Sequence, residues 1–244
     1  MISEIATRTI RPIAASAIYG IVFYQEYLGA IDSTNGYLLK IDPLTDNTII
    51  LNTHNWSDFV GATGLAIAGD TLWFTNRETV YACSLKDIRL EPQLFVRLDY
   101  DADGIAVYES TVYITSQKLG QILIYNRDSG SKITHFYNPG IGIENITIKG
   151  EEIWLTDNIE QTVYCLDRST GETIFSVLTP FESPTGLAFN RDQETGKETL
   201  YVAYADREIY IRDNPNAEPN YELQYRDRTF IHPLYFHYNR DRNY

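Results

Sequence analysis

The sequence has little positive charge, and this imbalance excludes one class of partner. Among 244 residues, 20 are Lys or Arg and 33 are Asp or Glu, which gives a formal net charge of −13 and an isoelectric point near 4.7. A protein that binds the nucleic-acid backbone needs a basic face, because phosphate groups are negative. We therefore expect no nucleic-acid partner, and we interpret the acidic excess as a solvated surface.

Long apolar runs are also missing. No stretch approaches the run of about 18 apolar residues that a membrane-spanning helix needs, and the first residues lack the continuous apolar core of a signal peptide. No linker rich in Pro, Ser or Gly divides the chain. These absences predict one domain over residues 1–244, with no membrane partner and a cytoplasmic location. Secretion is the alternative if a leader has been removed.

The sequence does contain a unit of about 40 residues that is copied several times. The clearest copy, Gly142–Val177, predicts four short strands, at Asn145–Lys149, Glu152–Thr156, Thr162–Asp167 and Thr173–Val177. The residue that opens the first strand recurs at spacings of 44, 40, 41 and 41 residues, as Gly20, Gly64, Gly104, Asn145 and Gly186. Four strands in a period near 40 residues are typical of a propeller blade.

We therefore predict an all-β protein, a β-propeller of four-stranded antiparallel blades with five complete repeats and a partial sixth. The partial repeat is suggested because His232–Asp241 matches Ser183–Asp192. Either the ring closes on five blades with this strand as an extra, or the chain is cut inside a sixth blade. A fused C-terminal domain is a separate possible partner. The alternating segment Thr7–Ile13 is predicted to pair as an outer strand of the last blade, which would remove an open sheet edge. A frayed tail is the alternative.

Cysteine is scarce, and the two that are present are predicted to stay unpaired. Cys83 and Cys165 fall in third strands of the second and fourth repeats, so one whole blade separates them. A disulfide needs Cα atoms roughly 4.4–6.8 Å apart. Two buried free thiols favour a reducing compartment.

One motif carries a resemblance to a known group. The pattern G-[IL]-A-[IV]-x-x-x-x-[IL]-W-[FL]-T-[DN] lies at Gly64–Asn76 and, with Asn replacing Gly, at Asn145–Asp157, and a D-x-x-T-G turn lies at Asp167–Gly171. The chain resembles the NHL-type β-propellers over Gly20–Asn239. This group includes SMP-30/gluconolactonase, virginiamycin B lyase and YncE-like proteins.

The resemblance implies the propeller fold and, as one alternative, an activity. It implies a metal-dependent hydrolase or lyase of the SMP-30 or virginiamycin B lyase kind. Two features depart from those enzymes. No His precedes the repeat Gly, where this chain has Tyr19, Thr63, Asp103, Glu144 and Thr185. The blade-by-blade metal ligands of SMP-30-like enzymes are only partly matched.

A propeller brings the loops that enter first strands and leave second strands to one face around its axis. We expect a ligand-binding face there, formed by Asp32, Asn76, Asp103, Glu144, Asn145 and Asp157. Ser116 also follows a second strand. Hard cations such as Ca²⁺ prefer oxygen ligands, so Asp103, Glu144 and Asp157 are predicted metal ligands. The alternative is that no cofactor binds and the Asp and Asn side chains cap turns.

The sequence contains no motif of a catalytic nucleophile, a phosphate-binding loop or a dinucleotide site. Catalytic residues are therefore unknown at this level. The leading interpretation is a non-enzymatic scaffold that binds a small molecule or a protein at its axial face. The metal-dependent hydrolase or lyase is the alternative.

Overall fold

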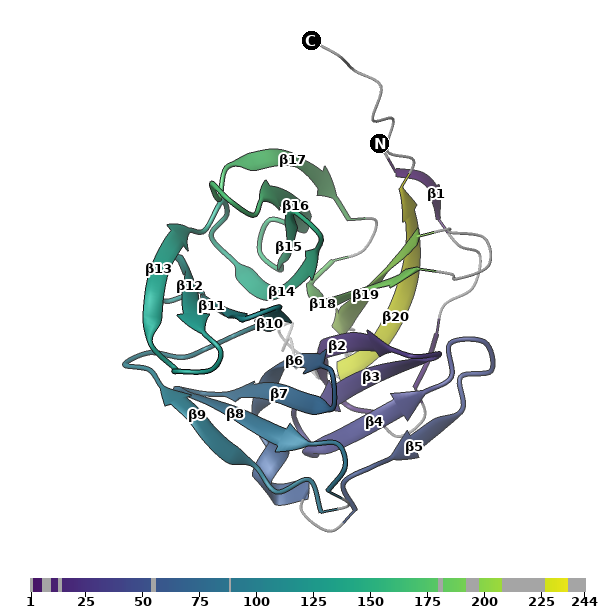
Figure 1. Ribbon diagram of the computed structural model, residues 1–244. Coiled ribbons are helices and arrows are strands. Elements are labelled where there is room, and N and C mark those ends of the chain that lie inside the picture. Colours follow the sequence, from purple (N-terminus) through teal and green to yellow (C-terminus); the bar gives the residue numbers. More distant parts are fainter. Residues whose placement is uncertain are drawn as a thin grey trace, which may run out of the picture.

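The computed structural model is described for residues 2–5, 10–12, 15–53, 56–87, 89–179, 182–191, 198–207 and 227–236. These residues form five four-stranded antiparallel sheets that radiate from a common centre (Figure 1). The predicted all-β class and β-propeller architecture are confirmed.

The first four sheets, called blades 1 to 4, each use four consecutive strands from the axis outward. Blade 1 contains β2 (Ile18–Tyr24), β3 (Tyr27–Asp32), β4 (Tyr37–Ile41) and β5 (Thr48–Ile50). A short 3₁₀ helix, η1 (Trp56–Phe59), leads into blade 2, which contains β6 (Ala62–Ala68), β7 (Thr71–Asn76), β8 (Thr79–Ser84) and β9 (Gln93–Arg97).

Blade 3 contains β10 (Ile105–Tyr108), β11 (Thr111–Ser116), β12 (Gln121–Asn126) and β13 (Lys132–Tyr137). Blade 4 contains β14 (Ile143–Lys149), β15 (Glu152–Asp157), β16 (Thr162–Asp167) and β17 (Thr173–Leu178). The four strands predicted for this repeat are confirmed to within two residues at each end. Blade 5 contains β18 (Pro184–Arg191), β19 (Glu198–Arg207), β20 (Asp227–Phe236) and β1 (Ile2–Ile5).

In blade 4 the second strand is the most buried and the rim strand is the most exposed. Every residue of β15 from Ile153 to Asp157 is buried, because neighbouring blades cover both faces of a second strand. In the rim strand β17, Thr173, Ile174 and Leu178 are exposed. The turn between β14 and β15 has only two residues, and Gly150 takes a φ of 58° there, a conformation that glycine adopts without strain.

The repeat landmark marks the place where neighbouring blades approach each other most closely. A Cβ atom on Gly104 would lie 2.6 Å from the Asn145 Cα, and one on Gly64 would lie 2.7 Å from the Ile105 nitrogen. Such contacts exclude a side chain, so glycine is needed at both positions. The innermost strands contact one another in the order β2, β6, β10, β14 and β18, and β18 contacts β2. The described blades therefore form a closed ring.

The threonine of the sequence motif ties one blade to the next. Thr115 Oγ1 accepts a hydrogen bond from Gly104 N at 2.7 Å and donates one to the Glu144 carbonyl at 3.2 Å. The equivalent threonines, Thr75 and Thr156, make the same pair of bonds in blades 2 and 4. At the junction of blades 5 and 1, Thr185 Oγ1 donates to the Ile18 carbonyl at 2.8 Å.

Blade 5 combines the two ends of the described chain (Figure 1). An N-terminal strand completes this blade as predicted, but it is β1, whereas Thr7–Ile13 was predicted. Within that segment, Ile10 forms an isolated bridge with Ile231, with N–O distances of 2.9 and 3.0 Å. The rest of the predicted strand, at residues 7–9 and 13, lies outside the described residues.

The prediction that a sixth repeat starts at His232 is wrong for the described residues. His232 lies in β20 and pairs with Val202 of β19. β20 is therefore the third strand of blade 5, and the described residues contain no sixth sheet. The similarity between the segments at 183 and 232 reflects two strands of one blade. The rest of that match, from residue 237, lies outside the described residues.

Both cysteines are buried and unpaired, as predicted. Burial raises the pKa of each thiol to about 12, with nearby carboxylates adding to the effect. Among the described residues, no helix has the length and apolar character needed to cross a membrane.

Candidate functional site

One buried side chain, Asn145, bridges blades near the axis of the ring. Asn145 replaces the glycine found at the other four landmarks and is only 2% exposed. Its Nδ2 donates across the axis to the carbonyl oxygens of Tyr19, at 3.1 Å, and Thr63, at 3.4 Å. Its Oδ1 accepts from Ile146 N at 2.9 Å. Asn145 was predicted to face a ligand, but its hydrogen bonds tie three blades together.

Two of the predicted carboxylates are occupied in holding turns. Asp32 is fully buried and accepts hydrogen bonds from the backbone N–H groups of Ser16, Ala17, Thr34 and Asn35, and from the Asn35 side chain. Asp157, at the equivalent end of β15, is also fully buried and accepts from the N–H groups of Gly142, Ile159 and Glu160 at 2.8–2.9 Å. Carboxylates bonded in this way organise a loop end and have little capacity left for a ligand.

Asn76 occupies the corresponding position in blade 2 but acts there as a donor. Its Nδ2 donates to the Val60 carbonyl at 3.0 Å. All three residues after second strands therefore lie where the sequence predicted, next to the loops that enter first strands. Their contacts agree with the turn-capping alternative.

The remaining two carboxylates, Asp103 and Glu144, lie at the starts of the first strands of blades 3 and 4. Asp103 is partly buried, and its Oδ2 accepts from Gln117 N at 2.6 Å. Burial raises the pKa of Asp103 to about 6, which the Gln117 N–H opposes and Asp101 reinforces. Glu144 is also partly buried, and its Oε1 accepts a hydrogen bond from the Asn158 side chain.

Three buried polar atoms at the same ends of blades 3 and 4 have no hydrogen-bond partner among the described residues. They are Ser116 Oγ, Asn138 Oδ1 and Asn158 Oδ1. The first two lie together, because Asn138 Nδ2 donates to the Ser116 carbonyl. Buried polar atoms are nearly always paired in proteins, with protein, water or ligand, so a group of three marks this place. We call Asp103, Ser116, Asn138, Glu144 and Asn158 the polar mouth.

Sequence reasoning found part of the polar mouth and missed the rest. Asp103 and Glu144 precede the repeat landmark, and Ser116 follows a second strand, so the repeat locates all three. Asn138 and Asn158 lie in loops whose length and course the repeat does not encode. Asn158 follows the predicted Asp157 directly, which was the one available signal.

The predicted metal ligands do not gather into a cluster. Among the described residues, no group of three or more His, Cys, Asp or Glu side chains is arranged to hold a metal ion. Asp157 points into its own turn, and Glu144 is bonded to Asn158. A divalent cation bound by Asp103, Glu144 and Asp157 stays a prediction.

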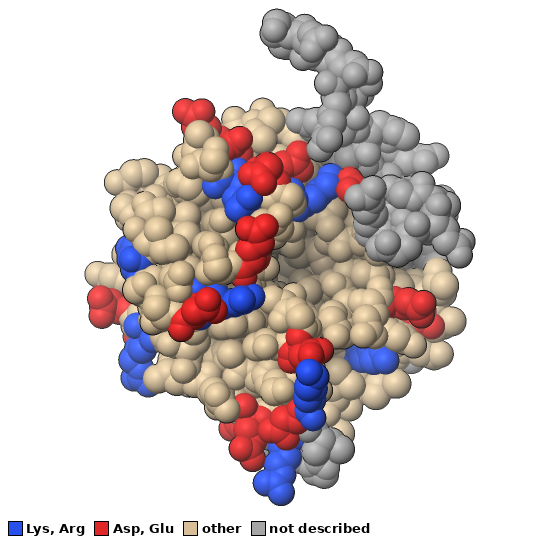
Figure 2. All heavy atoms as spheres, in the orientation of Figure 1, with Lys and Arg blue, Asp and Glu red and all other residues tan. Residues whose placement is uncertain are grey.

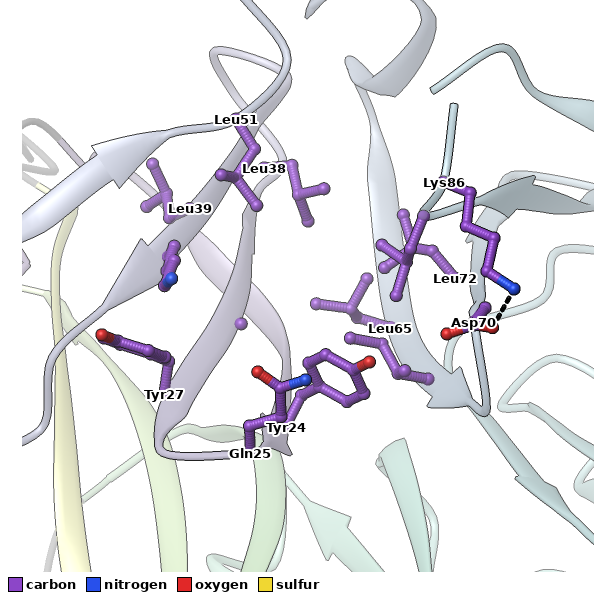
Figure 3. A pocket seen from close by; sticks show the side chains of 14 residues that line it. Tyr24, Gln25, Tyr27, Leu38, Leu39, Leu51, Leu65, Asp70, Leu72 and Lys86 are labelled. Carbon is purple, nitrogen blue, oxygen red and sulfur yellow. Dashed lines mark ion pairs between the residues drawn. The ribbon is translucent and has the colours of Figure 1, made fainter. Parts of the chain in front are cut away.

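A separate cavity of about 310 Å³ lies between blades 1 and 2 (Figure 3). Blade 1 contributes Leu38 and Leu51 to its wall, and blade 2 contributes Leu65 and Leu72 on the facing side. Tyr24 and Gln25 lie at one end, and an ion pair joins Lys86 to Asp70 at 2.6 Å near the opening. The sequence analysis did not predict this cavity.

Charge is mixed on the face seen in Figure 2. Acidic and basic side chains lie next to one another around a shallow hollow near the middle. The net charge of −13 therefore does not produce a uniformly acidic surface on this side.

No protein-family model matches the sequence, and no curated protein is similar enough in sequence to count as a relative. Solved structures do match. Glutaminyl cyclase from Myxococcus xanthus matches with a TM-score of 0.63 and 13% identity, and the alignment covers 94% of each chain. A chain of a nidogen/laminin complex matches with a TM-score of 0.57 and 11% identity over 73% of this chain and 70% of the other.

A streptogramin B lyase matches with a TM-score of 0.50 and 15% identity, over 80% of this chain and 65% of the lyase. These identities are low, so the likeness shows the fold and not the activity. Two of the three proteins are enzymes by name and one is part of a protein complex. Membership of the NHL-type group stays a prediction.

Proposed function

We propose that the protein is a non-enzymatic binding scaffold whose polar mouth holds a small polar molecule or a loop of a partner protein. The observation that carries the proposal is the set of three unpaired buried polar atoms beside two partly buried carboxyl groups. Each unpaired atom costs about 1–3 kcal/mol when left without a partner, so a ligand that supplies hydrogen bonds gains affinity there. The rigid blades on either side hold these groups in place.

A binding role also agrees with how the other candidate residues are used. Asn145 bridges blades near the axis, and Asp32 and Asp157 are saturated by backbone N–H groups. A hydrolase or lyase of the kind predicted from the resemblance needs a metal ion with a free coordination position, or an acid and a base that can reach the substrate. The pKa of about 6 at Asp103 favours this second candidate, because a general base works best near neutral pH.

Ligand titrations followed by amide chemical shifts test the proposal. Wild-type protein is titrated with a set of small polar compounds, and separately with Ca²⁺ and Mg²⁺ by calorimetry. Binding at the polar mouth should shift the amides of Gln117 and Asn158, and it should weaken in Ser116→Ala and Glu144→Gln. Asp128→Asn is the matched control, because Asp128 is exposed in a turn at the opposite ends of the strands.

Three outcomes separate the candidates. Metal-independent shifts at the polar mouth support the binding scaffold. Heat from Ca²⁺ or Mg²⁺ that vanishes in Glu144→Gln supports the metal-dependent enzyme. Shifts confined to other surfaces, unchanged by both variants, would contradict a role for the polar mouth.

A further inference from the structure

One position of the repeat carries an aromatic side chain in blades 2 to 5 but not in blade 1. Strand pairing aligns Trp73, Tyr113, Trp154 and Tyr201, each in the second strand of its blade. The same pairing puts Gly29 at this position in blade 1. Blade 1 therefore departs from the repeat in the middle of its second strand.

The residue paired with this position on the first strand changes as well. Opposite the aromatic residues the first strands carry small side chains, Ala66, Ala106, Thr147 and Ala188. Opposite Gly29 the first strand carries Val22, and a Cβ on Gly29 would lie 3.1 Å from its Cγ1. In blades 2 to 5 a large residue of the second strand therefore pairs with a small residue of the first strand. In blade 1 glycine of the second strand pairs with a branched residue of the first strand.

In the other blades the aromatic ring fills the junction with the next blade. Trp154 packs with Leu187, Leu200 and Val202 of blade 5 and meets Phe189 edge to face, with ring centres 5.0 Å apart. Tyr201 of blade 5 stacks on Phe23 of blade 1 at 5.6 Å. The position of Gly29 faces blade 2, since Leu65 Cδ2 lies 3.8 Å from its ideal Cβ.

The cavity of about 310 Å³ lies at this junction, and Gly29 is part of its wall. Its remaining wall is mostly leucine and isoleucine from both blades, including the buried Leu38, Leu65 and Leu72. Cavities of this size, with apolar walls and a few polar groups at one end, are typical of small-molecule sites. Figure 3 shows Tyr24, Gln25 and the Asp70–Lys86 pair at the margins of the otherwise apolar space.

Lys40 is the long side chain that pairs with Gly29 from the third strand, β4. At this position the other blades have Ala82, Ile124, Cys165 and Pro233. Its Nζ lies 3.6 Å from the centre of the Tyr27 ring, so the charge is held against Tyr27. The cavity persists with Lys40 as part of its lining.

We propose that the cavity between blades 1 and 2 binds a small aromatic molecule. Its ring, of phenol or indole size, takes the volume that the other four blades fill with a Tyr or Trp side chain. A polar substituent on the ring faces the open end, where Gln25 and the Asp70–Lys86 pair offer hydrogen bonds. Apolar cavities in proteins take up aromatic compounds of matching size, because burial of the ring is favourable and no polar group is left unpaired.

This site is independent of the polar mouth. Gln25 and Asp70 lie in turns between first and second strands, whereas the polar mouth follows second strands, at the other ends of the blades. Binding at one site therefore neither requires nor excludes binding at the other.

Indole, the side-chain group that blade 1 lacks, is the probe for the test. It is titrated into wild-type protein while amide chemical shifts and thermal unfolding are recorded. We expect saturable binding, with shifts at Gly29, Leu65 and Leu72 and a melting temperature that rises with indole concentration. The amides of the polar mouth should stay unshifted.

Filling the cavity should abolish the binding. Val22→Ala/Gly29→Trp rebuilds the pair found in the other blades and should remove the indole-dependent shifts and the rise in melting temperature. Val22→Ala alone is the matched control, since it enlarges the cavity and should bind at least as tightly as wild type. Ile67→Trp fills the same space from blade 2 and should also abolish indole binding. It replaces the double variant in the test if the double variant does not fold.

Two results would overturn the proposal. One is an absence of saturable shifts in wild-type protein up to the solubility of indole. The other is unchanged binding in a folded variant whose cavity has been filled. Shifts restricted to the polar mouth would count against this site while leaving the proposed function intact.

Discussion

The junction between blades 4 and 5 and the junction between blades 1 and 2 use one repeat position in opposite ways. At the first, Trp154 is 2% exposed, meets Phe175 and Phe189 edge to face, and donates its Nε1–H to Glu152 at 3.0 Å. At the second, Gly29 leaves a cavity lined by both blades. The repeat sets how neighbouring blades pack, and the departures at Gly29, Val22 and Lys40 accompany a cavity without interrupting the ring.

A second departure works in the other direction. Asn145 adds a side chain at the axis, where the other four blades have glycine, and its hydrogen bonds reach blades 1 and 2. At Gly29 a side chain is missing from the junction between two blades, whereas Asn145 adds a side chain that hydrogen-bonds to two other blades near the axis.

Removing the ring at the filled junction should have the largest effect. Trp154→Ala is expected to lower the free energy of unfolding by about 3–5 kcal/mol, because it empties a packed space between two blades. Urea denaturation measures the loss. Ile174→Ala, in the same blade but 45% exposed, is the control and should change little. An unchanged midpoint for Trp154→Ala would contradict the packing role of this position.

Changing the bridging side chain near the axis should be the next most damaging. Asn145→Asp keeps the shape but replaces the Nδ2 donor with a carboxylate oxygen that faces two carbonyl oxygens. We expect a loss of about 2–4 kcal/mol at pH 7 that becomes smaller in acid, when the carboxyl is protonated and can donate. Denaturation at pH 7 and pH 4 measures it.

Asn126→Asp is the control for that variant. Asn126 Oδ1 accepts from backbone N–H groups in an exposed turn, a task that Asp167 performs in blade 4. The change there should be neutral. Equal costs at positions 126 and 145 would show that the axial hydrogen bonds contribute nothing specific.

The carboxylates of blades 3 and 4 extend the comparison to charge. Asp157 accepts from three backbone N–H groups, whereas Asp103 accepts from one and its pKa is raised from 3.8 to about 6. Between about pH 4 and pH 6 the folded protein therefore binds more protons at Asp103 than the unfolded protein does. Stability contributed by the protonated form is complete below pH 3.8 and is lost as the pH rises through 6.

Asp103→Asn should remove this dependence. The variant is expected to be more stable than wild type by about 1–2 kcal/mol above pH 7, after allowance for partial exposure, and equally stable near pH 4. Denaturant titrations across pH 4–8 measure the difference. A constant difference between the two proteins at all pH values would contradict the raised pKa, and Asp128→Asn serves as the exposed control.

Filling the open junction should have the smallest effect and the opposite sign. Val22→Ala/Gly29→Trp is expected to raise the free energy of unfolding by about 1 kcal/mol, because the new ring buries apolar surface in an existing cavity. The gain is smaller than the loss at Trp154 because the new ring has to share the cavity with Lys40, which pairs with position 29. A strong destabilisation would show that Lys40, which pairs with position 29 from β4, leaves no room for a ring.

Features that depend on neighbouring residues could be predicted from the sequence alone. Period-two alternation and two-residue turns such as the one at Gly150 encode strands locally, so the strands of blade 4 were predicted to within two residues. The spacing of the landmark glycines revealed the blades, and it also placed Cys83 and Cys165 too far apart to pair. The carboxyl groups Asp103 and Glu144 were found because their position relative to the landmark repeats.

Only the tertiary structure decided what depends on residues far apart in the chain. β1 and β20 meet in one sheet although more than 200 residues separate them, and no local pattern names that partner. The bonds of Asn145 to Tyr19 and Thr63 cross the axis, and the polar mouth joins loops of two blades. The cavity at Gly29 lies between two facing blades and takes its wall from both, so the sequence of blade 1 alone does not encode it.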